Sequence, residues 1–168
     1  VICGGIYSSA WFWSMALHCR RTDPAVFEAA HSFVELADYI PAMLAGRTEP
    51  DRVVRGICMA GHKAMFNNAW NGLPDKEFLS MLDPEMAGLR DRLYDKAFTS
   101  DKPAGRLSQE QASSLGLKGG IPIAVGALDA HTGAVGAGIR EGTLVKVLGT
   151  SSCDMMVAPN TVEIADIP

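Results

Sequence analysis

The chain has 168 residues and a mass of 17.9 kDa, enough for one sizeable core, so it should form one domain or parts of two. Hydrophobic residues make up 48% and charged residues 20%, which is typical of a folded protein and argues against a disordered chain. The net charge of -4 argues against nucleic acid as a partner, because there is no excess of basic residues to neutralise phosphates. A local site can still bind a small anion through backbone N–H groups.

The cysteines are scattered, with no CxxC pair and no histidine at zinc-ligand spacing: Cys3, Cys19, Cys58 and Cys153. This pattern predicts neither a disulfide framework nor a metal site, and free thiols in a reducing cytoplasm are expected. No apolar run reaches the roughly 20 residues that span a bilayer, so we expect no membrane partner. Because the chain starts at Val1 without a methionine, we expect an internal segment of a longer protein.

Helices are predicted for the first part of the chain. Residues 9–21 are apolar nearly all round, which predicts a buried helix. Asp23 followed by Pro24 predicts the start of a second helix, because Asp caps orphan N–H groups and Pro fits the first turn.

A third helix is predicted from Ser32 and Glu35, which have the spacing of a capping box. Pro41 should kink this helix and Gly46 should end it. Its apolar positions recur at steps of three and four and predict one apolar face: Phe33, Leu36, Ala37, Ile40, Met43 and Leu44.

Residues 47–75 combine arginines, glycines and a proline with little periodicity, which predicts a loop-rich surface region where ligand chemistry often lies. Residues 83–94 begin with Asp-Pro and predict a helix. Residues 108–116 begin with S-x-x-Q and end in Gly, which predicts a short, capped helix.

The last part of the chain has the strand and helix patterns of an α/β fold. The apolar run 121–125 predicts a strand buried on both faces, and the small residues 130–138 predict a helix packed closely on a sheet. Residues 143–148 and 153–157 predict two strands, and the polar link between them, 149–152, predicts a hairpin turn.

Asp129 directly follows the predicted strand, at the carboxyl end where open α/β sheets place their ligands. A carboxylate there can accept a proton or help to hold a metal ion. It can equally cap the following helix, and this feature alone supports the two interpretations evenly.

Two loops offer groups for anions and sugars. The turn that begins with Gly149 and Thr150 has hydroxyls and backbone N–H groups for a phosphate, although any tight turn uses such residues. Lys63, with three donors, suits sugar hydroxyls or phosphate charge, or is a solvated surface lysine. His62 and His131 are candidate general bases, but a lone histidine is more often structural. The glycines from 133 to 138 lack the dinucleotide-binding order, and no Walker A loop is present.

Residues 126–138 (GALDAHTGAVGAG) and 144–154 (LVKVLGTSSCD) together resemble the FGGY carbohydrate kinases. Further segments resemble the kinases of the pentulose L-ribulose within that family: AGHK at 60–63 with WNGLP at 70–74, VELADYIPA at 34–42 and SAWFW at 9–13. The similarity runs through essentially the whole chain in order.

The resemblance implies parts of two actin-like, ribonuclease-H-like ATPase domains that close over a cleft. Residues 1–118 would be the C-terminal part of the first domain, on the sugar side, and residues 119–168 the N-terminal part of the second. It also implies that Asp129 binds the sugar and is the catalytic base, that Lys63 binds the sugar, and that Gly149 and Thr150 approach the ATP phosphates.

The implied activity is ATP-dependent phosphorylation of L-ribulose to L-ribulose 5-phosphate in arabinose catabolism, with Mg²⁺, in the cytoplasm. The partners would be sugar and ATP, and a homo-oligomer is left open. The family's D-x-G-[ST] phosphate loop and its Gly-rich adenine segment are absent, so the 168 residues alone should be inactive.

Two other functions stay open. An actin-like ATPase without a sugar substrate would share the hairpin, but it would not need the loop at His62 and Lys63. A binding domain could instead use Trp11, Trp13 and Trp70 as a partner surface, although tryptophans are more often core residues.

Overall fold

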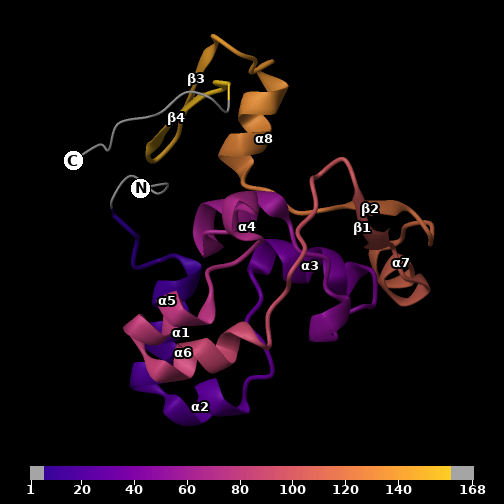
Figure 1. The fold of residues 1–168 in the computed structure, drawn as a ribbon. Coiled ribbons are helices and arrows are strands. Elements are labelled where there is room, and N and C mark those ends of the chain that lie inside the picture. The colour runs from indigo at the N-terminus through magenta and orange to yellow at the C-terminus, as the bar shows by residue number, and fades with distance from the viewer. Residues whose placement is uncertain (1–5, 160–168) are drawn as a thin grey trace.

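Helices dominate the first hundred residues of the protein, whose computed structural model describes residues 6–159 (Figure 1). The helices before residue 100 are α1 (Phe12–Thr22), α2 (Pro24–Ala29), α3 (Leu36–Leu44), the 3-10 turn η1 (Pro50–Arg52), α4 (Ile57–Ala64), the 3-10 turn η2 (Asn68–Trp70), α5 (Lys76–Leu82) and α6 (Pro84–Arg90). Within residues 6–159, no helix is both long and apolar enough to cross a membrane.

Two small antiparallel sheets and two helices follow. Strand β1 (Pro103–Arg106) pairs with β2 (Pro122–Ala124), and α7 (Gln109–Leu115) lies between them in the sequence. Helix α8 (Asp129–Gly136) precedes the hairpin of β3 (Leu144–Leu148) and β4 (Ser152–Met156). The mixture of helices and strands confirms the predicted α/β class.

Three of the predicted helix starts are confirmed by their caps. Asp23 accepts a hydrogen bond from the Val26 N–H at 3.2 Å, and Pro24 opens α2. Asp83 caps α6 in the same way, through the N–H of Glu85. Ser108 accepts from the N–H of Gln111 at the start of α7. A side-chain oxygen satisfies an orphan N–H group at each start.

The capping box predicted for α3 is wrong. Ser32 donates its hydroxyl to the carbonyl of Arg92 at 2.8 Å, and Glu35 pairs with Lys63. The helix begins at Leu36, three residues later than a cap at Ser32 would place it, and has no side-chain cap. Long-range partners therefore outcompete the local capping pattern at the start of α3. The predicted end of the helix is confirmed, because Gly46 takes a φ of +65°.

The predicted apolar face of α3 is not the buried one. Leu36 is 69% exposed and Ile40 is 42% exposed, whereas Asp38, Pro41 and Ala42 are buried. Helix α1, predicted to be buried, is only partly so: Phe12, Trp13 and Ala16 are buried, but Met15 is 52% exposed.

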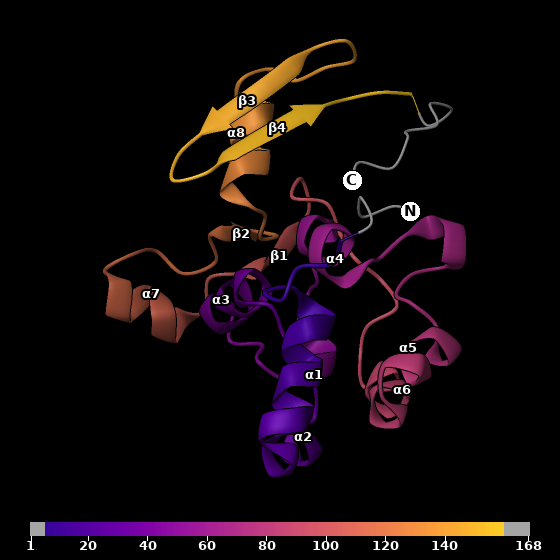
Figure 2. The same cartoon turned by 90° about the vertical axis from the view of Figure 1, so that its left-hand side faces the viewer.

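One hydrophobic core holds the helical part together, and it draws on α1, α2, α4, α5, α6 and the loop before α5. Its members are Phe12, Trp13, Ala16, Phe27, Ala64, Leu73, Leu79, Met86 and Leu89. Figure 2 shows α1 and α2 stacked end to end beside α5 and α6. The segment 47–75, predicted as loop-rich, contains helix α4, whose Ala64 reaches this core.

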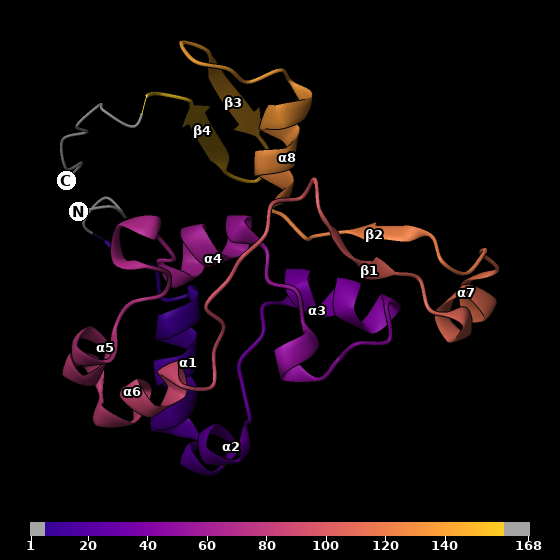
Figure 3. The same ribbon diagram turned by 45° about the vertical axis from the view of Figure 1, so that its right-hand side comes forward.

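Strand β2 does not have the two buried faces that its apolar sequence predicted. It pairs only with β1 among the described strands, and Ile121 beside it is 42% exposed, while Val125 at its end is buried. The hairpin of β3 and β4 and its turn are confirmed, and α8 packs on this hairpin as predicted. Figure 3 shows α8 and the hairpin as a separate group above α4.

Two glycines allow the chain after β2 to pass close to α3 and to the start of α4. A Cβ atom on Gly126 would lie 2.0 Å from the carbonyl oxygen of Ala37. A Cβ atom on Gly56 would lie 2.6 Å from the carbonyl oxygen of Gly126. Both distances are shorter than real Cβ contacts, so glycine is required for this backbone approach.

We expect Gly126→Ala to lower the free energy of unfolding by about 1–3 kcal/mol, because the new methyl group overlaps the Ala37 carbonyl and forces the backbone apart. Urea denaturation measures the change. The control is Gly88→Ala in α6, where nothing lies within 4 Å of the added carbon and stability should be unchanged or slightly higher. Equal stabilities of the Gly126 variant and the wild type would contradict the close approach.

Candidate functional site

Helices α4 and α8 are in contact beside Asp129, the predicted catalytic residue. The Cys58 Sγ of α4 lies 2.9 Å from the His131 Nδ1 of α8. The same sulfur accepts a hydrogen bond from the backbone N–H of Leu128 at 3.3 Å. Asp129 lies between these two partners in the sequence, and Figure 3 shows α8 rising from beside α4.

Packed aromatic rings extend the contact between α4 and α8. The His62 ring lies edge-on to the His131 ring, with 5.4 Å between the ring centroids, and it also packs against Trp11, at 5.0 Å. Partial burial lowers the pKa of His62, and the electrostatic interactions with His131 and Lys63 lower it further. Both histidines therefore have partners, which favours the structural interpretation of these residues over that of a free general base.

Asp129 is the first residue of α8 and is exposed. Leu128 occupies the cap position, so Asp129 is not the N-cap residue that one interpretation required. Its Oδ1 accepts from the N–H of Ala130 at 2.7 Å, and within residues 6–159 its other oxygen has no hydrogen bond. A carboxylate at a helix N-terminus is stabilised by the helix dipole and can still accept a proton.

Lys63 lies in the last turn of α4 and is not a freely solvated surface lysine. Its Nζ lies 3.2 Å from the Oε2 of Glu35, and the two side chains are only 25% and 18% exposed. The backbone of this turn is also fixed, because Tyr7 donates its hydroxyl to the carbonyl of Lys63 and Trp13 donates its indole N–H to Ala64. The ion pair therefore fixes the Lys63 side chain, and the ammonium group still has N–H donors that Glu35 does not use.

The predicted phosphate turn lies at the exposed tip of the hairpin. Gly149 donates its N–H to the carbonyl of Ser151 at 2.9 Å, so that donor is used inside the turn. Among the described hydrogen bonds, none involves the N–H or the hydroxyl of Thr150, and these groups remain for a ligand. Figures 1 to 3 show the turn at the same end of this group as the start of α8.

Sequence reasoning missed two partners of the candidate residues. The sequence pattern predicts that Cys58 is one of four free thiols and that Glu35 is part of a capping box. Both errors arose because the segment 47–75 was predicted as loop, whereas α4 places Cys58, His62 and Lys63 on a helix. The spacing of four residues between Cys58 and His62, which puts them on one helix face, was the available signal.

A buried polar pair lies just beneath the start of α4. Asp38 and Arg55 are each only 3% exposed. Asp38 accepts from the Gly56 N–H at 2.9 Å, and Arg55 donates to the carbonyl of Phe33 and lies over the Tyr94 ring. Burial raises the pKa of Asp38 to about 6, although the Gly56 N–H and Arg55 oppose the shift.

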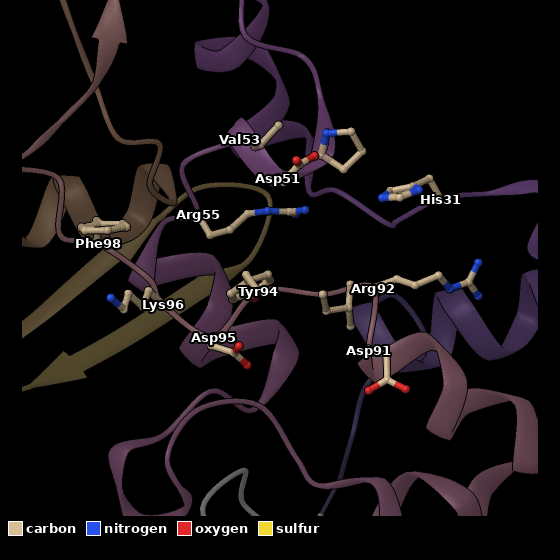
Figure 4. A pocket seen from close by; sticks show the side chains of 12 residues that line it. His31, Asp51, Val53, Arg55, Asp91, Arg92, Tyr94, Asp95, Lys96 and Phe98 are labelled. Atoms are coloured by element: carbon tan, nitrogen blue, oxygen red, sulfur yellow. The ribbon is translucent and has the colours of Figure 1, made fainter.

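Two cavities lie near these elements. The first, of about 490 Å³, is bordered by Arg55, Arg92 and Lys96 and also by carboxylates such as Asp91, and none of the predicted site residues lines it (Figure 4). The second, of about 430 Å³, lies beside α4 and has an aromatic lining of Trp11, His62, Phe66 and Trp70. The remaining tryptophan of the predicted partner surface, Trp13, is a core residue.

No protein-family model matches the chain. Its sequence is nevertheless similar, over more than nine-tenths of its length, to curated carbohydrate kinases. These relatives are ribulokinases: identity is 51% over 154 residues with the ribulokinase of Vibrio parahaemolyticus, 39% over 163 residues with that of Shouchella clausii, and 33% over 156 residues with that of Bacillus licheniformis.

The three alignments cover 92%, 96% and 92% of this chain but only 27%, 28% and 27% of the relatives. The chain therefore spans about a quarter of the length of the curated relatives it matches. The resemblance to the FGGY carbohydrate kinases is confirmed, and so is its narrower form, the resemblance to the kinases of L-ribulose.

The raised pKa of Asp38 predicts a pH dependence of stability. The native state holds a proton on Asp38 that the unfolded state releases between pH about 4 and 6, so this contribution to stability is lost as the pH rises through that window. The Asp38→Asn variant has no group that titrates at this position. The difference between its free energy of unfolding and that of wild type should therefore change by about 2–3 kcal/mol, in favour of the variant, as the pH rises through the window.

Urea denaturation of both proteins at several pH values measures this difference. The exposed Asp51→Asn is the matched control, and it should show no such shift. If wild type gains stability relative to Asp38→Asn as the pH rises from 4 to 6, the burial of Asp38 is not the dominant influence on its pKa.

Proposed function

We propose that the protein to which this chain belongs transfers the γ-phosphoryl group of ATP to L-ribulose and forms L-ribulose 5-phosphate, a step of arabinose catabolism. The observation that supports this proposal most strongly is the similarity to ribulokinases over 92% of the chain, at up to 51% identity in the relatives named above. No feature of the described residues favours the alternative of an actin-like ATPase without a sugar substrate.

Asp129 is the proposed base that takes the proton of the sugar hydroxyl. Phosphoryl transfer needs mainly positioning and stabilisation of charge, and a carboxylate near the attacking hydroxyl orients it and receives its proton. The exposed carboxylate of Asp129 has one oxygen on the Ala130 N–H and the other available as an acceptor, which supports this role.

Lys63 is the proposed sugar-binding residue of α4. An ammonium group has three donors, and the Glu35 carboxylate uses one of them. The others can reach sugar hydroxyls, while the ion pair limits the rotamers of a long side chain and so reduces the entropy lost on binding. Because Cys58 of the same helix contacts α8, Lys63 and Asp129 belong to adjoining elements.

Gly149 and Thr150 are the proposed contacts to the ATP phosphates. The hydrogen bond within the turn uses the Gly149 N–H, so Thr150 supplies the donors and Gly149 supplies the space for close approach. In the described part of the chain, no group of three or more potential metal-ligating side chains converges. We propose that Mg²⁺ arrives with ATP, bound to its phosphate oxygens.

We further propose the domain assignment that the family resemblance implies, with residues 1–118 on the sugar side and residues 119–168 carrying Asp129 and the phosphate turn. Closure of the two parts would exclude water, which competes as an acceptor of the phosphoryl group. The remaining contacts to ATP would come from residues outside the 168, so the chain alone should be inactive. A cytoplasmic location and a homo-oligomer stay predictions.

The central test of this function is Asp129→Asn in the full-length protein. We expect kcat for ATP-dependent phosphorylation of L-ribulose to fall by about 10²–10⁴-fold, because the amide cannot accept the proton. The KM values for both substrates should change little, since the side chain keeps its shape and its hydrogen bond to Ala130. A coupled assay of ADP release measures both constants.

Asp91→Asn is the matched control, because this exposed carboxylate directly follows α6 and pairs with Lys76 of α5 at 2.6 Å, away from α8. It should retain the wild-type kcat. Near-normal turnover by the Asp129 variant would remove this residue from the chemistry, and absence of turnover with any pentulose in the wild type would refute the proposed function itself.

A further inference from the structure

We propose that Cys58 is a positioning residue for Asp129, a role that rests on the proposed function of that carboxylate. The thiol lies on α4, contacts the residue before Asp129 through a backbone N–H, and contacts the residue two positions after it through an imidazole nitrogen. One sulfur atom therefore holds both sides of the turn that presents the carboxylate.

The two contacts are chemically compatible. The Leu128 N–H donates to the sulfur, so the sulfur is an acceptor in that hydrogen bond. The thiol proton is then free to be donated to Nδ1 of a neutral His131, whose own proton resides on Nε2. With this tautomer the thiol is used once as donor and once as acceptor, and neither partner is left unpaired.

A second contact on the same helix face supports His131. His62 lies four residues after Cys58, so the two side chains project from the same side of α4. The edge-on packing of the His62 and His131 rings, at 5.4 Å, limits the rotation of the imidazole that receives the thiol proton. His131 is thus fixed by hydrogen bonding and by packing from one helix.

The position of Cys58 is not explained by core packing. It is half-buried and is not among the residues of the hydrophobic core or among those packed against it, whereas Cys19 is one of the latter. Its polar partners both lie in the segment around Asp129. Because Lys63 follows five residues later on α4, the thiol also ties the proposed sugar-binding helix to the proposed base.

The test uses Cys58→Ala and Cys58→Ser in the full-length protein. We expect Cys58→Ala to lower kcat by about tenfold with KM for L-ribulose and ATP nearly unchanged, because the loss of fixed geometry affects the transition state and not substrate binding. Cys58→Ser keeps a group that donates and accepts, and it should restore kcat to within about threefold of wild type.

Amide hydrogen exchange provides a readout that does not depend on activity. The Leu128 amide should exchange faster in Cys58→Ala than in wild type, because its acceptor has been removed. Cys19→Ala is the matched control: it removes a thiol packed against the core, and it should change the thermal stability without lowering kcat.

The outcomes separate the two proposals. If the wild type phosphorylates L-ribulose and Cys58→Ala has normal kcat, the positioning role is wrong and the function stands. If the wild type is inactive with pentuloses but the Leu128 amide loses protection, the function is wrong and the contact stands without a catalytic role. Equal losses of kcat in Cys58→Ala and Cys19→Ala would mean that the Cys58 thiol has a structural role and does not position Asp129.

Discussion

The close approach of backbone at Gly56 and Gly126 is the constraint on which the site depends. The chain leaving β2 passes between α3 and the start of α4 with no room for a side chain at either glycine. This path brings Leu128 and His131 within reach of Cys58. A methyl group at Gly126 would push the segment outward and would move Asp129 away from the helix that carries Lys63.

The same region contains two buried charged residues, Asp38 and Arg55. Asp38 holds the Gly56 N–H at the start of α4, and Arg55, one residue earlier, is fixed by the Phe33 carbonyl and the Tyr94 ring. Buried polar groups are costly unless they are hydrogen-bonded, so such networks specify one arrangement of the elements they join. Here the network sets where α4 begins relative to α3, and therefore where Lys63 and Cys58 lie.

Sequence patterns predicted the elements whose signals are local. Asp23, Asp83 and Ser108 cap helices as expected, and the hairpin after α8 has the predicted strands and turn. Patterns failed where distant partners decide the structure. Glu35 pairs with Lys63 and does not form a capping box, and Leu36 and Ile40 of the predicted apolar face of α3 are exposed. The candidate site residues came from the family resemblance, because position along the chain alone left Asp129 evenly balanced between a base and a cap.

We propose that α4 and α8 present Lys63 and Asp129 to one sugar. A crystal structure of the full-length protein with L-ribulose and a non-hydrolysable ATP analogue tests it most directly. We predict the sugar between the two side chains, with the Asp129 carboxylate about 2.6–3.2 Å from the hydroxyl that receives the phosphoryl group. A sugar bound in the cavity beside Arg55, out of hydrogen-bonding reach of both residues, would contradict it.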